Sequence, residues 1–328
     1  MMSRRLSIVC TMLICAFVSG IAGCSSSSNS ALVPPSGGTE ALRELPQSAG
    51  TWTTKASMPS LRVYPGVSAV GGKLYAIGGF NNGDLTVVEE YDPTTNAWST
   101  KAPMPIARHA FGTGVVGTTV FCFGGYSQGA TNVLDAYHTT TNTWTSKAHM
   151  ATARHSLGFG VIGGKLYAVG GDTGFGPVSM LEVYDPTTNS WSTKAPMPTA
   201  RSGLAAGVVN GILYAIGGGT AGPLNTVEAY NPATNTWTTK APMPTARVYP
   251  TVGVIKNKIY VIGGDSASGN SSANEVYNPA TNSWSTKASM PTARYGLSEA
   301  VIAKILYAVG GQNDNFGYLN TVEAYSTH

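Results

Sequence analysis

The sequence predicts an all-β protein in which one unit is repeated around a ring. Only 11% of its 328 residues are charged and 40 are glycine, which favours a β-rich body over a helical or disordered one. Six Gly-Gly pairs recur along the chain, from Gly78-Gly79 to Gly310-Gly311. A tryptophan recurs every 46 or 47 residues, at Trp52, Trp98, Trp144, Trp191, Trp237 and Trp284. A period this regular is typical of a repeat architecture.

A single unit contains four expected strands. In one copy these are residues 154–162, 165–169, 181–184 and 190–194, rich in β-branched and aromatic residues and bounded by turn residues. Gly163-Gly164 between the first two strands suits a two-residue hairpin turn. Four antiparallel strands per unit, packed face to face around an axis, predict a β-propeller in which the innermost strand comes first.

The two ends of the repeated region predict how the ring closes. Residues 51–56 form a fourth strand with no first three before it, and residues 294–325 supply three strands with no fourth. We therefore expect the N-terminal strand to complete the last blade, which gives six blades over residues 51–328. The alternative, five blades with loose ends, would expose apolar strand edges.

The repeated strings resemble the kelch repeat family. The matching elements are an arginine that opens each unit, strings such as Leu-Tyr-Ala-Ile-Gly-Gly and Glu-x-Tyr-Asp-Pro, and the tryptophan after Thr-Asn-x. The resemblance extends from Thr51 to Tyr325 and implies a six-bladed kelch-type β-propeller. It also implies that the loops between the second and third strands share a face with the arginine-bearing loops.

The first 50 residues predict export and lipid anchoring. Arg4 and Arg5 precede a short apolar stretch, and residues 21–24 (Ile-Ala-Gly-Cys) resemble the lipobox of bacterial lipoproteins. This implies a signal peptide over residues 1–23, lipidation of Cys24, and a Ser/Gly/Pro-rich tether over residues 24–50. We expect a lipid-anchored protein of the bacterial cell envelope, at the outer membrane if the cell has one.

Cysteine usage argues against disulfides in the exported body, and its charge argues against one class of partner. Cys10 and Cys15 leave with the signal peptide, and Cys122 lies in an apolar run typical of a core strand, so no disulfide framework is expected. Without Arg4 and Arg5, 18 basic residues face 16 acidic ones. This near-neutral balance argues against nucleic acid as a partner, and we expect a monomeric body.

The arginines that open the units are the leading candidates for a ligand site. Six-fold repetition would place them around one mouth of the central channel, where they bind a ligand or hydrogen-bond carbonyl groups of their own blades. Aromatic residues near them suit stacking on a sugar ring or contact with an acidic peptide. The candidate residues are Arg62, Arg108, Arg154, Arg201, Arg247, Arg294, Tyr64, His109, His155, Tyr249 and Tyr295.

The repeated acids and the variable loops are further candidates for a role in structure or in binding. One acid per blade precedes the tyrosine of the third strand, which indicates repeated charge pairing or hydrogen bonding within the strands rather than catalysis. The acids are Glu89 or Glu90, Asp135, Glu182, Glu228, Glu275 and Glu323. The loops between the second and third strands vary most between units and form a candidate recognition surface.

The sequence offers little support for the catalytic sites found in enzymes of this fold. A copper-radical oxidase of this fold needs a Cys–Tyr link, which Cys122 in a core strand does not suit. His109 and His155 without a carboxylate are thin support for a metal site, and no cofactor is expected. A sialic-acid mutarotase of this fold needs an acid/base pair and an anion-binding arginine, and we find no acid outside the repeated position to serve it.

The favoured function is therefore a lipid-anchored, non-catalytic binding module for a protein or glycan at the arginine-bearing face. The alternatives are a sugar-processing enzyme resembling the mutarotase and a structural or adhesion scaffold. As a binder, the protein is expected to lose ligand capture in Arg108→Ala and Arg154→Ala without a change in melting temperature.

Overall fold

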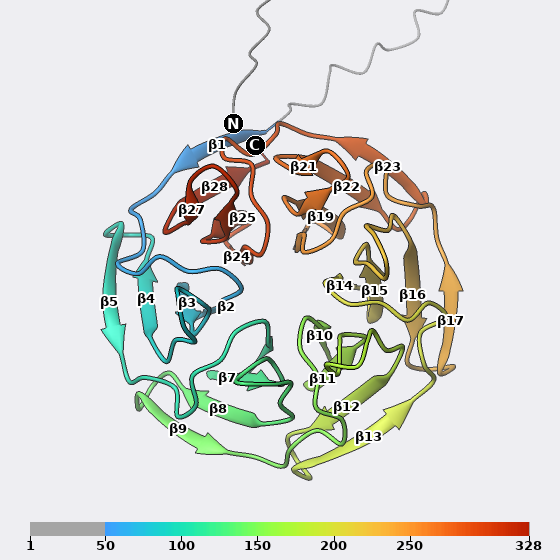
Figure 1. Cartoon of the computed structure of the whole chain (residues 1–328), viewed down its shortest axis with the longest axis horizontal. Coiled ribbons are helices and arrows are strands. Elements are labelled where there is room, and N and C mark those ends of the chain that lie inside the picture. The colour runs from blue at the N-terminus through green and yellow to red at the C-terminus, as the bar shows by residue number, and fades with distance from the viewer. Residues whose placement is uncertain (1–49, 328) are drawn as a thin grey trace, which may run out of the picture. The chain divides into compact units, whose positions relative to one another are not determined.

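The computed structural model describes residues 50–327, and these form a ring of six four-stranded antiparallel sheets (Figure 1). No helix occurs in this part of the chain. Each sheet is one blade of a propeller, with its first strand at the centre and its fourth at the rim. The predicted fold class and the predicted number of blades are confirmed.

The strands follow the chain from blade to blade. Blades 1 to 3 consist of β2 (Gly66–Val70), β3 (Lys73–Ile77), β4 (Val88–Asp92) and β5 (Ala97–Lys101); β6 (Gly112–Val116), β7 (Thr119–Phe123), β8 (Leu134–His138) and β9 (Thr143–Ser146); and β10 (Gly158–Ile162), β11 (Lys165–Val169), β12 (Leu181–Asp185) and β13 (Ser190–Lys194). Blades 4 to 6 consist of β14 (Ala205–Val209), β15 (Ile212–Ile216), β16 (Val227–Asn231) and β17 (Thr236–Thr239); β18 (Thr251–Ile255), β19 (Lys258–Ile262), β22 (Asn274–Asn278) and β23 (Ser283–Thr286); and β24 (Ser298–Ile302), β25 (Ile305–Val309), β28 (Val322–Ser326) and β1 (Thr51–Thr54). Two short hairpins stand on the loops of blades 5 and 6: β20 (Asp265–Ser266) with β21 (Gly269–Asn270), and β26 (Gln312–Asn313) with β27 (Gly317–Tyr318).

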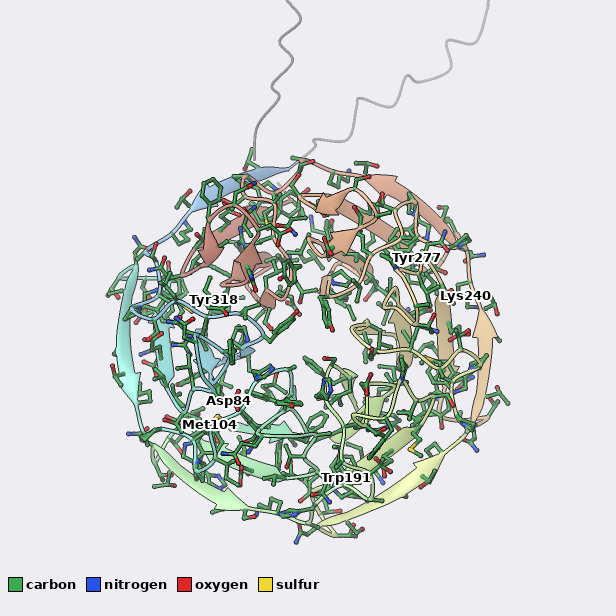
Figure 2. All side chains as sticks on the ribbon, viewed as in Figure 1. Asp84, Met104, Trp191, Lys240, Tyr277 and Tyr318 are labelled. Carbon is green, nitrogen blue, oxygen red and sulfur yellow. The ribbon has the colours of Figure 1, made fainter. Side chains whose placement is uncertain are left out.

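The hydrophobic core is divided into six clusters, each between two neighbouring blades. The second strand of every blade is apolar on both faces because both faces are covered, as in Leu74–Ile77 of β3. Figure 2 shows side chains throughout the spaces between the sheets, with Trp191 near the rim. Its ring packs 5.3 Å from that of Tyr184, and its Nε1 donates a hydrogen bond to the carbonyl oxygen of Ala148 at 2.7 Å. The tryptophans therefore connect neighbouring blades.

The repeated Gly-Gly pairs are explained by contact with the next blade. A Cβ atom at Gly78 would lie 2.7 Å from the carbonyl oxygen of Arg108, which is too close for any side chain. The amide of Gly79 donates a hydrogen bond to that same oxygen at 3.0 Å. Both glycines also have positive φ. Each pair therefore fastens the end of a second strand to the arginine loop of the following blade.

The last blade is completed by the N-terminal strand, as predicted. β1 pairs antiparallel with β28, with Thr51 opposite Ser326 and Thr54 opposite Glu323. The indole of Trp52 donates a hydrogen bond to the carbonyl oxygen of Ala288 at 2.8 Å, which links this blade to blade 5. The ring is thus closed without a covalent bond between its ends.

The predicted signal peptide (1–23), Cys24 and nearly all of the tether (24–50) lie outside the described residues. Within residues 50–327, no helix has the length and apolar character that crossing a membrane requires.

Candidate functional site

One face of the propeller carries both kinds of loop that the sequence pointed to, and we call it the loop face. It consists of the arginine loops before the innermost strands and the loops between the second and third strands. Isolated β-bridges join the two loops within each blade, for example His109 with Tyr126 and Val248 with Asp265. The shared face that the kelch resemblance implied is therefore confirmed.

The six arginines lie below the surface of this face. All six are fully buried, and each forms an ion pair with an acid on the third strand of its own blade. Five pairs are Arg108–Asp135 at 2.8 Å, Arg154–Glu182 at 2.8 Å, Arg201–Glu228 at 2.5 Å, Arg247–Glu275 at 2.7 Å and Arg294–Glu323 at 2.6 Å, and the sixth joins Arg62 to Glu89. The charge pairing predicted for the repeated acids is confirmed.

Backbone carbonyl groups accept hydrogen bonds from further terminal N–H groups of the arginines, whereas the buried Nε atoms of all six have no hydrogen-bond partner among the described residues. In blade 5, Arg247 donates to the carbonyl oxygens of Gly263 at 2.6 Å and Val261 at 3.4 Å. Burial lowers the pKa of Arg247, while the Glu275 carboxylate opposes that shift. A ligand would reach these groups only if the loops moved, so the geometry favours the alternative in which each arginine serves its own blade. Removing one is then expected to lower stability, contrary to the expected unchanged melting temperature.

The aromatic candidates occupy two different positions rather than one series. Tyr64 and Tyr249 stand two residues after their arginines, whereas His109, His155 and Tyr295 stand one residue after theirs. The residue that stands two positions after the arginine is hydrogen-bonded, in every blade, to its counterpart in the next blade. These backbone N–H to O=C hydrogen bonds form a closed ring around the mouth of the channel, with N–O distances of 2.6 to 3.3 Å. Its members are Tyr64, Ala110, Ser156, Gly203, Tyr249 and Gly296, all with φ between 53° and 60°.

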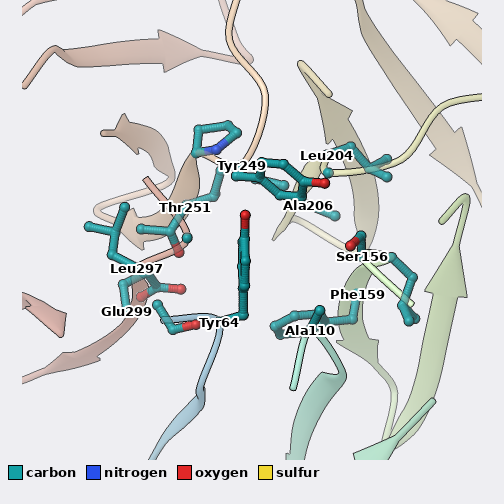
Figure 3. A pocket seen from close by; sticks show the side chains of 18 of the residues that line it. Tyr64, Ala110, Ser156, Phe159, Leu204, Ala206, Tyr249, Thr251, Leu297 and Glu299 are labelled. Atoms are coloured by element: carbon teal, nitrogen blue, oxygen red, sulfur yellow. The ribbon is translucent and has the colours of Figure 1, made fainter. Parts of the chain in front are cut away.

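Two tyrosines in this ring are held in a strained conformation. Positive φ costs a bulky residue roughly 1 kcal/mol or more, and the equivalent positions of blades 4 and 6 are glycine. The Tyr64 and Tyr249 rings lie 5.0 Å apart, and burial raises the pKa of both hydroxyls. In Figure 3 the Tyr64 side chain stands in the middle of the cavity with its hydroxyl towards Tyr249. Strain kept at such a position marks a functional candidate.

The aromatic side chains of the loop face form a continuous arc. Centroid distances between neighbours run from 5.0 to 6.4 Å. Tyr126 stands between His109 and His155, so the two histidines are each in contact with the tyrosine. The arc consists of Tyr64, Phe80, His109, Tyr126, His155, Tyr249, Tyr295 and Tyr318, and blade 4 contributes no member.

A groove of about 300 Å³ lies where the arc is interrupted, between blades 4 and 5. Tyr249 and Asp265 line one side of it, and the loop Gly219–Pro223 lines the other. Ser202 and Thr220 also line it. An aromatic ring, a carboxylate and hydroxyl groups in one groove are suited to a polyhydroxy ligand.

The charged side chains of the loops between the second and third strands are all acidic. These loops contain Asp84, Asp172, Asp265 and Asp314, and no lysine or arginine. Asp84 lies 2.6 Å from Nδ1 of His109. Because the six arginines are buried and paired, this face favours a neutral or cationic ligand over an anionic one.

A carboxyl group in the central channel escaped the sequence analysis. Glu299 stands five residues after its arginine and lines a cavity of about 100 Å³ whose walls also include Tyr64 and Tyr249 (Figure 3). Burial raises its pKa to about 8. The equivalent residues of the other blades are Val67, Thr113, Phe159, Ala206 and Val252. Comparing the innermost strands position by position would have found it.

The fold and the loop face define this protein as a six-bladed β-propeller. The chain belongs to the kelch repeat family: the model of the KLHDC2/KLHL20/DRC7 Kelch-repeats domain matches residues 66–264 and 161–328. A search of curated protein sequences gave no match. A solved structure titled "Structure of YjhT" aligns with a TM-score of 0.70 and 17% identity, over 82% of this chain and 94% of that one. At this identity the likeness concerns the fold.

Proposed function

We propose that the protein is a non-catalytic binding module that recognises a glycan on the loop face, in the groove between blades 4 and 5. The observation that carries this proposal is the meeting of Tyr249, Asp265 and the hydroxyl-bearing residues Ser202, Thr220 and Ser266 in the lining of one groove of about 300 Å³. The aromatic arc beside it extends the surface on which further sugar rings can stack.

The chemistry of the groove favours a neutral or amino-bearing sugar. Tyr249 offers an aromatic ring, and the Asp265 carboxylate accepts hydrogen bonds from sugar hydroxyl groups. Asn270 donates to Asp265 Oδ1 at 3.3 Å, which positions this carboxylate. The loop Gly219–Pro223 and the loop that begins at Asp265 contain no arginine or lysine, and Arg201 and Arg247 are buried and paired, so an acidic sugar or acidic peptide finds little positive charge in the groove.

A glycan array with matched variants tests the site. In Tyr249→Gly the ring is replaced by the residue that blades 4 and 6 have at the same left-handed position, so the backbone is preserved. We expect Tyr249→Gly and Asp265→Asn each to weaken binding of the captured glycan about tenfold, as lost stacking and charged hydrogen bonds predict. Asp185→Asn, on the opposite face, is the control. Equal binding by all three variants would move the site elsewhere, and capture of proteins alone would replace the glycan.

We further propose that the body is held at the cell envelope by a lipid on Cys24. The support is the sequence alone, because these residues lie outside the described part. Mass spectrometry of the purified full-length protein should show a diacylglyceryl adduct and loss of residues 1–23. Cys24→Ser should release the protein into the soluble fraction, and a Cys24→Ser protein that still sediments with membranes would argue against the anchor.

Sugar-anomer exchange is a second candidate because Glu299 is an acid outside the repeated position, inside a cavity. The arginine that an anionic sugar requires is not free among the described residues, since all six arginines there are paired with acids. Measuring anomer exchange by NMR on neutral and acidic sugars distinguishes the binding function from the enzymatic one. Turnover that Glu299→Gln abolishes would replace binding by catalysis.

A further inference from the structure

The central channel contains a second chamber, distinct from the groove on the loop face. Its volume is about 310 Å³, and it meets the smaller cavity at Phe159, Ala206, Val252 and Glu299. It lies along the ends of the innermost strands, next to the turns that lead to the second strands, and therefore away from the loop face.

The wall of this chamber is mainly apolar, and Ser68, Thr113 and Glu299 are its polar side chains. In each innermost strand, the residue two positions after Glu299 or its equivalent has a small or branched side chain that lines the chamber. Together the six blades form one collar. The collar consists of Ala69, Val115, Val161, Val208, Val254 and Val301. A collar of this kind excludes ions but accepts an alkyl chain.

Glu299 is the only ionisable side chain among the residues that line the chamber. No hydrogen bond or ion pair joins its carboxyl group to another described residue. The strands packed against β24 are β2, β18 and β25, and their one titratable side chain is Tyr307, which is buried between blades 6 and 1. Lys304 follows β24 in the turn to β25. Burial alone accounts for the raised pKa of Glu299, at about 8.

We propose that this chamber binds a primary ammonium group at the end of an unbranched alkyl chain, with the ammonium group on Glu299 and the chain in the valine collar. A carboxylate in an apolar site is costly unless it is paired, and a bound ammonium group supplies the pair. One carboxylate falls short of the several oxygen ligands that Ca²⁺ or Mg²⁺ takes, and residues 50–327 hold no cluster of three metal-binding side chains. The free amine and the lysine side chain share this chemistry.

Calorimetry on the full-length protein tests the proposal with three compounds: n-pentylamine, n-pentanol and acetyl-lysine methylamide, in which the acetyl group is on the α-nitrogen and the side-chain ammonium group is free. We expect n-pentylammonium to bind at least tenfold more tightly at about pH 8.5 than at about pH 6.5, because the proton on Glu299 competes with it while the amine stays charged up to about pH 10. n-Pentanol should show no such dependence. Binding of n-pentylammonium alone identifies a free amine, whereas binding of acetyl-lysine methylamide as well identifies a lysine side chain.

Variants taken from the other blades make the test specific. Glu299→Gln keeps the shape of the side chain, and Glu299→Thr installs the residue of blade 2; both should lose the pH-dependent binding of n-pentylammonium. Asp314→Asn, on the loop face, should retain it. The proposal is overturned if n-pentylammonium does not bind, or binds Glu299→Gln as tightly as the unmodified protein. Neither result would count against the proposed glycan binding in the groove, because Tyr249→Gly tests that proposal separately.

Discussion

The acids of the third strands and the acid of the channel lie in contrasting surroundings. Glu275 is buried against Arg247 at 2.7 Å, and its counterparts repeat this pair in every blade. Glu299 occurs in one blade and has no charged partner among the described residues. Repetition therefore identifies groups that hold each blade together, whereas a departure from the repeat identifies a group left available for a ligand. Four predictions test this contrast.

The largest effect is expected from breaking a repeated pair. Arg247→Met leaves the Glu275 carboxylate buried without its partner and should lower the free energy of unfolding by about 3–5 kcal/mol. The double variant Arg247→Met with Glu275→Leu should recover most of this loss, because no charge is then buried alone. Urea denaturation measures both. A loss below about 1 kcal/mol in the single variant would mean that the pair contributes little.

The next effect concerns the strand that closes the ring. Trp52 and Trp98 make matched contacts: each ring lies 5.1 Å from a tyrosine ring, and each Nε1 donates to an alanine carbonyl oxygen at 2.8 Å. Either tryptophan changed to alanine should cost about 2–3 kcal/mol, less than a fully buried tryptophan because both are partly exposed.

Hydrogen exchange separates the two tryptophan variants. β1 is continuous with the rest of the ring at one end only, so Trp52→Ala should also raise amide exchange in β28. Trp98→Ala should leave β4 protected, because β5 is continuous with the ring at both ends. Equal exchange in the two variants would show that closure by β1 is as firm as a covalent connection.

The sequence predicted the repeated parts of the molecule better than the single ones. Period, turn residues and the unmatched ends were enough for six blades and for closure by residues 51–56. The arginines were placed on the correct face, but their burial was missed because their partners depend on strand pairing, which sets Val261 opposite Glu275. The groove could not be predicted, since its shape depends on the conformations of Gly219–Pro223 and of the loop that begins at Asp265.

A smaller effect is expected from the unpaired acid, and it depends on pH. Burial raises the pKa of Glu299 from its ordinary value of 4.5 to about 8, so the folded state holds its proton more tightly than the unfolded state does. Stability should therefore fall as the pH rises from about 4.5 through about 8, and then level off. We expect a loss of about 2 kcal/mol, less than the full shift implies because Glu299 is only partly buried in the channel. Glu299→Gln should remove this pH dependence in urea denaturation; an unchanged profile would assign it to other groups.

The smallest effect is expected at the tip of a variable loop. Phe175 is fully exposed, and its loop is held instead by the Asp172 carboxylate, which accepts hydrogen bonds from the amides of Gly174 at 2.7 Å and Gly176 at 3.3 Å. Phe175→Ser should therefore change the free energy of unfolding by less than about 0.5 kcal/mol, because no packing is lost. It should also leave glycan affinity within about twofold, because blade 3 does not line the groove. A stability loss above about 1 kcal/mol would show that Phe175 is packed in solution, and a larger loss of affinity would extend the glycan site across blade 4 to blade 3.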